Sequence, residues 1–281
     1  MNSKLKGIER MTHNMIIEQP LTQTELVRSL YNLGVREGMT LLVHTSLRSF
    51  GRYIPGDAST VITALRLALG PQGTLVMPTQ SSDLTDPATW QAPPADPKWW
   101  NLIREEMPAY DPYLTVTNGM GRVAELFRLL PGVIRSMHPQ LSFAAQGPLA
   151  EALLAEHSLD FALGEASPLA RMYENDAYVL LLGCGHESNT SLHLAEYRTD
   201  YAGKEEQELL APVLQQGSKQ WVKRRDINIT SDDFDRLGAD FEREYPGEAR
   251  RVEIGQASCF LGRQRVLVDY AQAWLPVNRT L

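Results

Sequence analysis

His193 and Glu196 are the residues in this sequence whose types and spacing best fit acid–base chemistry. They stand three apart in a segment that is predicted to be helical, so their side chains lie on one face of the helix, one turn apart. A carboxylate in that position can influence the orientation and the charge of an imidazole. The pair is a candidate general base with an orienting partner, although a solvated or capping pair on a helix surface would show the same spacing.

The stretch 178–198 contains the elements that would position this pair. Residues 178–182, YVLLL, form an unbroken apolar run that is typical of a buried strand, and Gly183 and Gly185 end it. A buried strand that ends in a glycine-rich turn delivers the polar residues after it into a crevice. This context favours a functional role for His193 over a surface role.

The turn at 44–51, HTSLRSFG, is a second candidate site, because it follows the short apolar run 40–43 and precedes a helix. Its backbone N–H groups, its hydroxyl side chains and Arg48 could together hold the oxygens of a phosphate group. The segment lacks both the Gly-x-Gly-x-x-Gly and the Gly-Lys-Ser/Thr patterns, which argues against a dinucleotide site and a P-loop. A turn whose hydroxyls only satisfy their own backbone is the alternative interpretation.

Two other kinds of chemistry around His193 fit the sequence less well. A zinc site formed by His186, His193 and Glu196 would need two histidines seven apart, which does not match the i, i+4 pairing of helical zinc sites, so no metal is expected. Cys184 could be a nucleophile near His186, but a cysteine at the end of an apolar strand is more often a small core residue. There is also no Gly-x-Ser-x-Gly motif that would indicate a hydrolase.

Residues 80–117 interrupt the helix and strand patterns and are rich in proline, aromatic and acidic residues. A loop of this length inside a compact domain is often a lid or a binding loop. Carboxylates interspersed with aromatic rings could line a pocket for a polar cation. The alternative is a proline-stiffened surface loop whose rings pack on the core.

The order of the remaining patterns indicates an α/β fold, because strand, helix and strand alternate across 40–77. In such a unit, ligands bind beyond the C-terminal ends of the strands. Thr22 and Glu25 form a capping box at the start of the first helix, and Asp57 and Ser231 are predicted to cap two later helices. Helices are also predicted over 121–130, 148–156 and 266–274, and another helix is predicted to begin at 167. A turn that feeds a short strand is predicted over 135–143, and strands are predicted at 221–222 and 252–254.

The composition excludes several classes of protein. Hydrophobic residues make up 43% and charged residues 22%, as in an ordinary globular domain, and no apolar run approaches the roughly 20 residues that span a bilayer. The formal charge of −7 argues against nucleic acid as a partner and would attract a cationic ligand. The chain has two cysteines and no signal-peptide pattern, so we expect a cytoplasmic protein without a membrane partner.

Five segments together resemble the aminoglycoside 3-N-acetyltransferases of the antibiotic N-acetyltransferase superfamily. They are LLVHTSLRSFG at 41–51, GPQGTLVMPT at 70–79, RSMHPQLSFAAQGP at 135–148, SPLARMYE at 167–174 and VLLLGCGHESNTSLHLAEYR at 179–198. The resemblance implies an α/β fold of the antibiotic N-acetyltransferase type, which is distinct from the common GNAT acetyltransferase fold. We expect one compact domain over 21–281, with a mixed, largely parallel central sheet flanked by helices, and a flexible arm over 1–20.

The resemblance also implies roles for individual residues. The family's catalytic histidine corresponds to His193, and Glu196 is the candidate orienting residue. The positions that match the family's coenzyme A site are Thr45, Ser46, Leu47, Arg48, Ser49, Ser136, His138 and Thr190. The candidates for binding a cationic acceptor are Asp83 and Asp86, in the loop after MPT, and Asp226.

We therefore expect an N-acetyltransferase that moves an acetyl group from acetyl-CoA to the 3-amino group of an aminoglycoside antibiotic and so confers resistance. The acceptor amine is mostly protonated at neutral pH, and a histidine, with an unperturbed pKa of roughly 6.5, is suited to remove its proton. Direct transfer is preferred because no activated cysteine or serine is evident. The alternatives are an acyltransferase of the same fold that acts on another amine and a non-catalytic coenzyme A- or sugar-binding relative, in each case as a monomer or homodimer.

Overall fold

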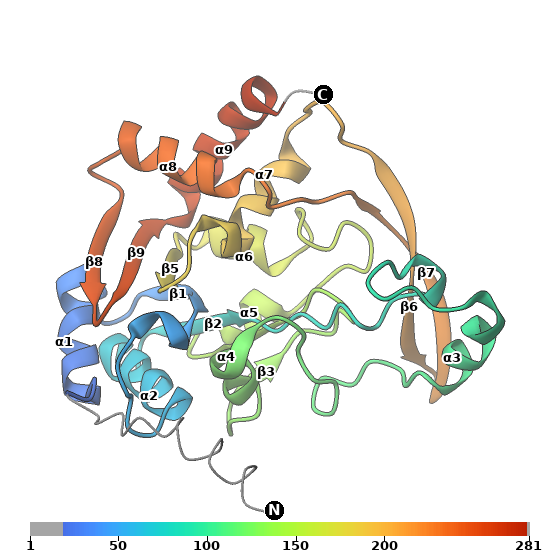
Figure 1. Ribbon diagram of the computed structural model, residues 1–281, viewed down its shortest axis with the longest axis horizontal. Helices are drawn as coiled ribbons and strands as arrows, with labels where there is room; N and C mark the ends of the chain where they lie inside the picture. Colours follow the sequence, from blue (N-terminus) through green and yellow to red (C-terminus); the bar gives the residue numbers. More distant parts are fainter. Residues whose placement is uncertain (1–18, 280–281) are drawn as a thin grey trace, which may run out of the picture.

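The computed structural model describes residues 19–279, so the predicted N-terminal arm lies outside the described residues except for its last two positions. A seven-stranded sheet runs through the protein, and a separate two-stranded hairpin lies at one side (Figure 1). The strands of the sheet are β1 (Thr40–Thr45), β2 (Thr74–Pro78), β3 (Ile134–Arg135), β4 (Phe143–Gln146), β5 (Tyr178–Leu182), β8 (Arg250–Ile254) and β9 (Ala257–Arg263). The hairpin consists of β6 (Glu206–Gln215) and β7 (Ser218–Ile227).

The sheet is mixed and has the strand order β3-β4-β2-β1-β5-β9-β8. β1 runs parallel to both of its neighbours, so that Leu42 lies opposite Val76 of β2 and Val179 of β5. The other neighbouring strands pair in the antiparallel sense. The predicted α/β fold with a mixed central sheet is confirmed, but the sheet is not largely parallel as predicted, because only β2, β1 and β5 run parallel to one another.

Helices cover both faces of this sheet. The α-helices are α1 (Gln23–Leu33), α2 (Ala58–Leu69), α3 (Trp100–Glu106), α4 (Gly121–Arg128), α5 (Ala150–Leu154), α6 (Pro168–Glu174), α7 (His193–Arg198), α8 (Phe234–Glu244) and α9 (Gln264–Asn278). One core lies between the sheet and α1, α2 and α4, and the other lies between the sheet and α5 to α9. Among residues 19–279, no helix is long and apolar enough to cross a membrane.

The central strands are apolar on both faces because they contribute to both cores. Side chains alternate along a strand, so Val43 and Leu180 contact the α1–α2 side while Leu42 and Val179 contact the α6–α9 side. A strand that is buried on both faces is expected to have an unbroken apolar sequence, as β1 and β5 do. The apolar runs that indicated these two strands are therefore explained by their place in the sheet.

The predicted helix caps are only partly present. The Oγ of Thr22 accepts a hydrogen bond from the backbone N–H of Glu25 at 3.2 Å, but the Glu25 carboxylate pairs with Arg52 and does not complete the capping box. Asp57 precedes α2 without a side-chain cap, because its carboxylate pairs with Arg122 at 2.5 Å. The predicted cap at Ser231 is wrong, since α8 begins after Asp233.

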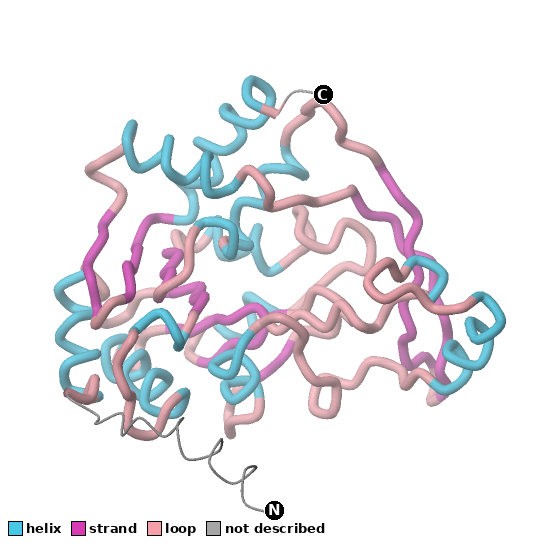
Figure 2. The backbone as a smooth tube through the Cα atoms, in the orientation of Figure 1, coloured by secondary structure: helices cyan, strands magenta, loops and turns pink. Residues whose placement is uncertain are grey.

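The segment 80–117 and the β6–β7 hairpin pack together into a lobe beside the sheet, which we call the side lobe (Figure 1). The backbone N–H of Tyr110 donates to the carbonyl of Pro212 at 3.0 Å, and the indole N–H of Trp221 donates to the carbonyl of Arg104 at 3.1 Å. Most of the segment is loop, as predicted, although α3 and two 3-10 helices, Pro87–Thr89 and Pro97–Trp99, interrupt it (Figure 2). The sequence did not predict β6, so this partner of the long loop was missed.

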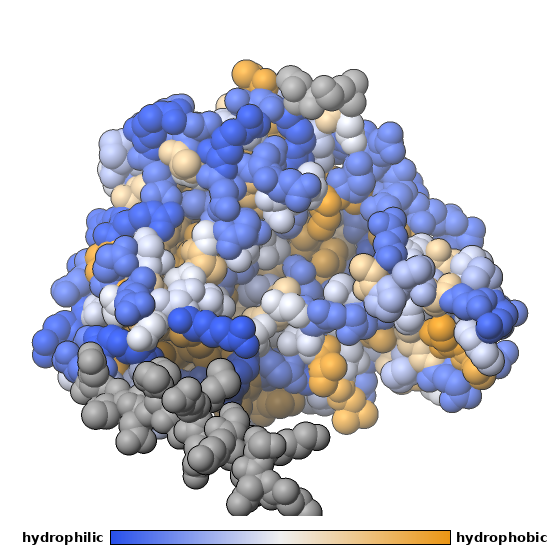
Figure 3. All heavy atoms as spheres, viewed as in Figure 1, coloured by the Kyte–Doolittle hydropathy of each residue, from blue (hydrophilic) through white to orange (hydrophobic). Residues whose placement is uncertain are grey.

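The surface in this orientation is mostly hydrophilic and has a central hollow in which apolar side chains are visible (Figure 3). Several exposed apolar side chains belong to the side lobe, among them Trp99, Tyr113 and Leu114.

Candidate active site

The C-terminal ends of β1 and β5 bring the two candidate sites of the sequence side by side. The backbone N–H of Ser46, just after β1, donates to the carbonyl of Leu182 at the end of β5, with a distance of 2.9 Å. Gly183 has a φ of +75°, and a Cβ at this position would lie 2.8 Å from the Cβ of Ser49. The chain therefore needs glycine here, both for the backbone conformation and for the close approach of the two turns.

A cavity of about 300 Å³ opens at this edge of the sheet. It brings together three of the predicted site residues, Thr45, Thr190 and His193. The other residues that line it are Val43, His44, Pro78, Gln80, Gly119, Met120, Ala124, Cys184, Glu187, Ser188 and Ser231. The position of the cavity, beyond the C-terminal ends of parallel strands, is where ligands bind in α/β sheets.

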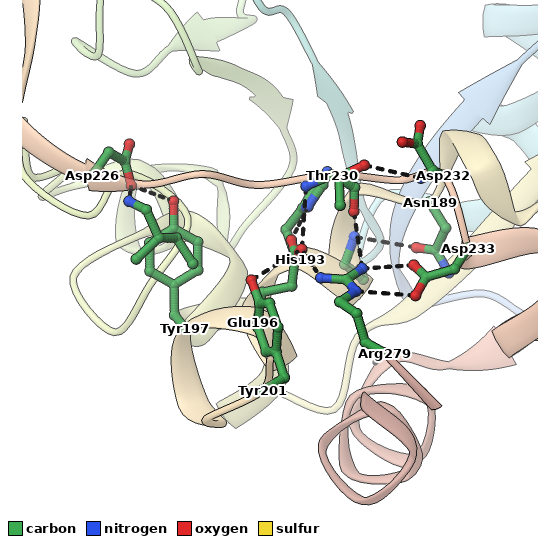
Figure 4. Close-up of polar contacts among 12 residues, drawn as sticks. Asn189, His193, Glu196, Tyr197, Tyr201, Asp226, Thr230, Asp232, Asp233 and Arg279 are labelled. Carbon is green, nitrogen blue, oxygen red and sulfur yellow. Dashed lines mark hydrogen bonds and ion pairs between the residues drawn. The ribbon is translucent and has the colours of Figure 1, made fainter. Parts of the chain in front are cut away.

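His193 and Glu196 form a close pair beside this cavity. The Oδ1 of Asn189 accepts a hydrogen bond from the N–H of Ser191 and caps the short 3-10 helix Thr190–Leu192, which leads directly into α7. His193 is the first residue of α7, and its Nδ1 lies 2.5 Å from the Oε2 of Glu196 (Figure 4). The His193 side chain keeps 13% of its surface exposed, whereas the Glu196 side chain keeps none.

This contact determines which nitrogen of His193 can act as a base. Because a carboxylate is an acceptor only, the neutral imidazole carries its proton on Nδ1 and donates it to Glu196. The lone pair then lies on Nε2. The pair can therefore take up a proton at Nε2 while Glu196 stabilises the imidazolium that forms.

His44 is a second histidine in the cavity, and it lies in the candidate turn 44–51 although no role was predicted for it individually. It lies at the end of β1 and is 7% exposed. Burial, and then repulsion from a protonated His193, lower the pKa of His44 to about 3. His44 is therefore neutral near pH 7, so it can form hydrogen bonds in the cavity without adding a positive charge.

Comparison with known proteins assigns the chain to a family. Residues 42–276 match the family model described as aminoglycoside 3-N-acetyltransferase. The chain belongs to this family. It is 41% identical to YokD of Bacillus subtilis, named an aminoglycoside N(3')-acetyltransferase-like protein, over 92% of this chain and 94% of that protein. The crystal structure of YokD matches with a TM-score of 0.90 over 93% of this chain and 96% of that one.

Two other solved acetyltransferases of similar structure carry ligands. AAC-IIIb, solved as a binary complex with CoASH, is 30% identical and has a TM-score of 0.81 over 92% of this chain and 97% of that one. AAC-VIa, bound to sisomicin, is 30% identical and has a TM-score of 0.80 over 92% and 98% of the two chains. The fold expected for an aminoglycoside 3-N-acetyltransferase is therefore confirmed.

In this acetyltransferase, the predicted coenzyme A turn forms a short 3-10 helix, Leu47–Phe50, beside the cavity. Thr45 lines the cavity, and the Arg48 side chain is exposed. The Oγ of Ser49 donates to the Oγ of Ser46 at 2.8 Å, so part of the hydroxyl capacity of the turn is used within it.

The structure does not bring Ser136 and His138 to the cavity beside His193. The Oγ of Ser136 lies 2.9 Å from Nδ1 of His157 and accepts from the N–H of Phe143 at 3.0 Å. The Nδ1 of His138 accepts from the N–H groups of Gln140 and Leu141, at 3.1 and 2.9 Å. Both side chains are buried and hold the chain around β4 together.

The three predicted acidic residues have different surroundings. Asp83 is exposed and accepts a hydrogen bond from the side chain of Asn118, which is next to Gly119 of the cavity wall. Asp86 is buried, where it caps a 3-10 helix and pairs with Arg104 at 2.7 Å.

Asp226 lies apart from the His193–Glu196 pair (Figure 4). It is buried, pairs with Arg224 and accepts a hydrogen bond from the hydroxyl of Tyr197 at 2.6 Å. Asp86 and Asp226 therefore already have partners within the protein, and neither lines the cavity around His193.

Three further residues of the 184–187 segment can now be placed. Glu187 lines the cavity with an exposed carboxylate, and it was not predicted as a site residue although it lies in the segment 179–198. Burial, and then the negative charge of Glu187, raise the pKa of the Cys184 thiol to about 12. His186 hydrogen-bonds Glu242 at 3.0 Å, on α8, and packs against Phe260.

Proposed function

We propose that this protein transfers an acetyl group from acetyl-CoA to the 3-amino group of an aminoglycoside, with His193 as general base. The observation that carries the proposal is the 2.5 Å contact between His193 and the buried Glu196 at the edge of the cavity. Family membership supports the reaction class, and the CoASH and sisomicin complexes of AAC-IIIb and AAC-VIa support the two substrates.

The proposed reaction uses His193 to carry one proton. The acceptor amine first releases its ammonium proton to solvent and then attacks the thioester carbonyl, so an N–C bond forms, the nitrogen becomes positively charged and the carbonyl oxygen becomes negatively charged. His193 takes a proton from this nitrogen at Nε2, and Glu196 stabilises the resulting imidazolium. The C–S bond then breaks, and the proton on His193 passes to the departing sulfur, which leaves as the thiol of coenzyme A.

Direct transfer is favoured over an acetylated cysteine. Cys184 lines the cavity, but with a pKa of about 12 its sulfur is protonated near neutral pH. Since the thiolate and not the thiol is the effective nucleophile, Cys184 is a poor candidate for a covalent intermediate.

We assign the coenzyme A side of the site to the turn after β1 and to Thr190. Arg48 offers an exposed guanidinium that can pair with a phosphate, and Thr45 and Thr190 offer hydroxyl groups at the cavity wall. These donors suit an anionic ligand whose other end must reach His193.

We assign the acceptor side to the carboxylates of Glu187, which lines the cavity, and of Asp83, whose partner Asn118 is next to Gly119 of the cavity wall. Asp83 and Glu187 are both exposed, and a polyamine needs carboxylates to replace the hydration that it loses on binding. The net charge of −7 would add long-range attraction for such a cation.

A release assay for the coenzyme A thiol, run with a panel of aminoglycosides and simple amines, tests this proposal. We expect release that depends on an aminoglycoside, with the added acetyl group located on the 3-amino nitrogen by fragmentation mass spectrometry. Release with simple amines alone would indicate an acyltransferase with another acceptor. Binding of coenzyme A without release in any reaction would indicate a non-catalytic relative.

A further inference from the structure

Glu196 carries a carboxylate that is fully buried, and a buried charge is strongly unfavourable unless it is paired and hydrogen-bonded. Its Oε2 faces His193, which is neutral when it acts as a base. The charge must therefore be offset at the other oxygen. The Oε1 of Glu196 accepts hydrogen bonds from the guanidinium of Arg279 at 2.5 Å and from the backbone N–H of Thr230 at 3.2 Å.

Arg279, which follows α9, is held in a fixed orientation by a second carboxylate. Its Nη2 lies 2.6 Å from Oδ1 of Asp233, and its Nε lies 3.0 Å from Oδ2 of the same residue. Figure 4 shows the guanidinium between Glu196 and Asp233. A two-point contact of this kind fixes the plane of the guanidinium, so its remaining nitrogen is directed at Glu196.

The same guanidinium also joins three segments that are distant in sequence. Its Nη2 donates to the carbonyl of Thr230 at 3.2 Å, and it lies 4.7 Å from the ring centre of Tyr201. Glu196 belongs to α7, Asp233 precedes α8 and Arg279 follows α9. The side chain of Arg279 is 11% exposed, so these contacts are largely shielded from water and salt.

We propose that Arg279 is a positioning residue for acetyl transfer, which holds Glu196 against His193 and offsets the charge of Glu196 so that His193 can be a neutral base. The inference rests on the proposed role of His193. The proposal extends the His193–Glu196 pair to a series of four side chains. Asp233 orients Arg279, Arg279 holds Glu196, and Glu196 orients His193.

The charges around Glu196 explain why Arg279 matters for the protonation of His193. A lone carboxylate 2.5 Å away would favour the imidazolium form of His193, which cannot accept a proton. Burial, and then the charge of Glu196, raise the pKa of Tyr201 to about 12, so the phenol that faces Glu196 is neutral. His44, on the β1 side of His193, is neutral as well.

Arg279 itself stays charged over the whole working range of pH. Burial opposes its charge, but the hydrogen bonds to Asp233 and Glu196 outweigh burial, so the pKa of Arg279 is raised. Removing its side chain would leave Glu196 without the positive charge that now offsets it.

Arg279→Ala, Arg279→Lys and the control Arg236→Ala test the inference. Arg236 also links α8 to the end of α9, through the carbonyl of Asn278 at 2.9 Å and the ring of Trp274, but among the described residues it forms no hydrogen bond or ion pair with Glu196. For each variant, kcat, both KM values and the pH dependence of kcat/KM are measured beside the melting temperature.

We expect Arg279→Ala to lower kcat about tenfold or more, as part of the roughly hundredfold to ten-thousandfold that a general base contributes, with both KM values nearly unchanged. The acid limb of kcat/KM should move to higher pH, because His193 then holds its proton more tightly. Arg279→Lys keeps the charge but cannot contact two carboxylates as a fork, so its kcat and its acid limb should lie between those of the parent and those of Arg279→Ala. Arg236→Ala should keep the parent pH profile.

The outcomes separate this inference from the proposed function. If Arg279→Lys and every folded preparation of Arg279→Ala keep the parent kcat and acid limb, while His193→Ala is inactive, Arg279 is merely structural and the inference is overturned. If His193→Ala is fully active, the proposed function fails first. In a Glu196→Gln background, Arg279→Ala should have a smaller effect on kcat than in the parent, and an equal effect would contradict the proposed route through Glu196.

Discussion

Nδ1 of His193 and Oε2 of Glu196 lie 2.5 Å apart, and no part of the Glu196 side chain is exposed. The carboxylate is therefore positioned to act on the imidazole and has no surface with which to bind a substrate. His193, by contrast, retains some exposed surface and lines the cavity. This difference in burial fits their proposed roles, because a general base must reach the substrate and its orienting partner need not.

Glu196→Gln should reduce kcat by roughly a hundredfold to ten-thousandfold while coenzyme A binding is retained. Arg279 would attract the oxygen of the new amide, so the NH2 group of that amide would face Nδ1 of His193. This arrangement favours the tautomer that carries the proton on Nε2, which leaves no lone pair on Nε2 to accept a proton. The matched control is Glu242→Gln, which alters a second His–Glu pair at 3.0 Å, outside the cavity. Equal kcat losses in the two variants would show that the effect is not specific to the cavity.

Arg48→Ala should weaken coenzyme A binding by roughly 1.5–3 kcal/mol if its guanidinium makes a charge-assisted bond to phosphate. Acceptor affinity should change little. Isothermal titration calorimetry measures both, and Arg28→Ala, which removes an exposed arginine from α1, is the control. Unchanged coenzyme A affinity in Arg48→Ala would remove this residue from the site.

Asp83→Asn should raise the KM for an aminoglycoside and leave the KM for acetyl-CoA unchanged, because one carboxylate at the edge of the cavity is lost. The KM for the aminoglycoside in the parent should also rise with salt, which shortens the reach of charge to roughly 8–10 Å. Steady-state kinetics at two ionic strengths checks both points.

Asp226→Asn is the comparison for Asp83→Asn. It breaks a buried pair with Arg224, so it should lower the melting temperature, with a loss of about 3–5 kcal/mol in the free energy of unfolding, and leave the acceptor KM unchanged. A raised acceptor KM in Asp226→Asn with normal stability would instead place the acceptor in the side lobe.

The sequence was informative wherever a site depends on neighbours in the chain. The spacing of His193 and Glu196 determines their contact, because both belong to one turn of α7. The apolar runs of β1 and β5 similarly predicted two buried strands. The alternation of strand, helix and strand across 40–77 predicted the edge of the sheet at which ligands bind.

The rest of the site depends on contacts between distant segments, which one sequence does not reveal. Arg279 lies 83 positions from Glu196 and reaches it only because α9 packs beside α7. Asp226 carried a charge that suggested a ligand, but its partner Arg224 projects from the same strand two residues earlier. The strand β6 was missed because it contains Pro212 and begins with charged residues, and its pairing with β7 stabilises it.

Stability should fall as the pH is lowered from about 6.5 toward 5, because buried histidines must stay neutral in the folded protein. Burial is the main cause that lowers the pKa of His44 to about 3, that of His157 to about 4 and that of His138 well below its ordinary value. Unfolded histidines titrate near 6.5, so the unfolded chain binds more protons in this range and is favoured by acid.

Each of these histidines can contribute up to about 1.4 kcal/mol per pH unit. Denaturant unfolding at several pH values between 5 and 7 measures the slope. In His157→Gln the slope of the unfolding free energy against pH should fall, by an amount that approaches the equivalent of about one bound proton near pH 5. A free energy of unfolding that does not change with pH would contradict the burial of these neutral rings.

Single-turnover acetyl transfer by His193→Ala, measured beside its affinity for coenzyme A, tests the central claim most directly. If His193 is the general base, the rate of transfer falls roughly a hundredfold to ten-thousandfold while coenzyme A affinity and melting temperature stay close to the parent values. A near-normal rate of acetyl transfer in this variant would contradict the account.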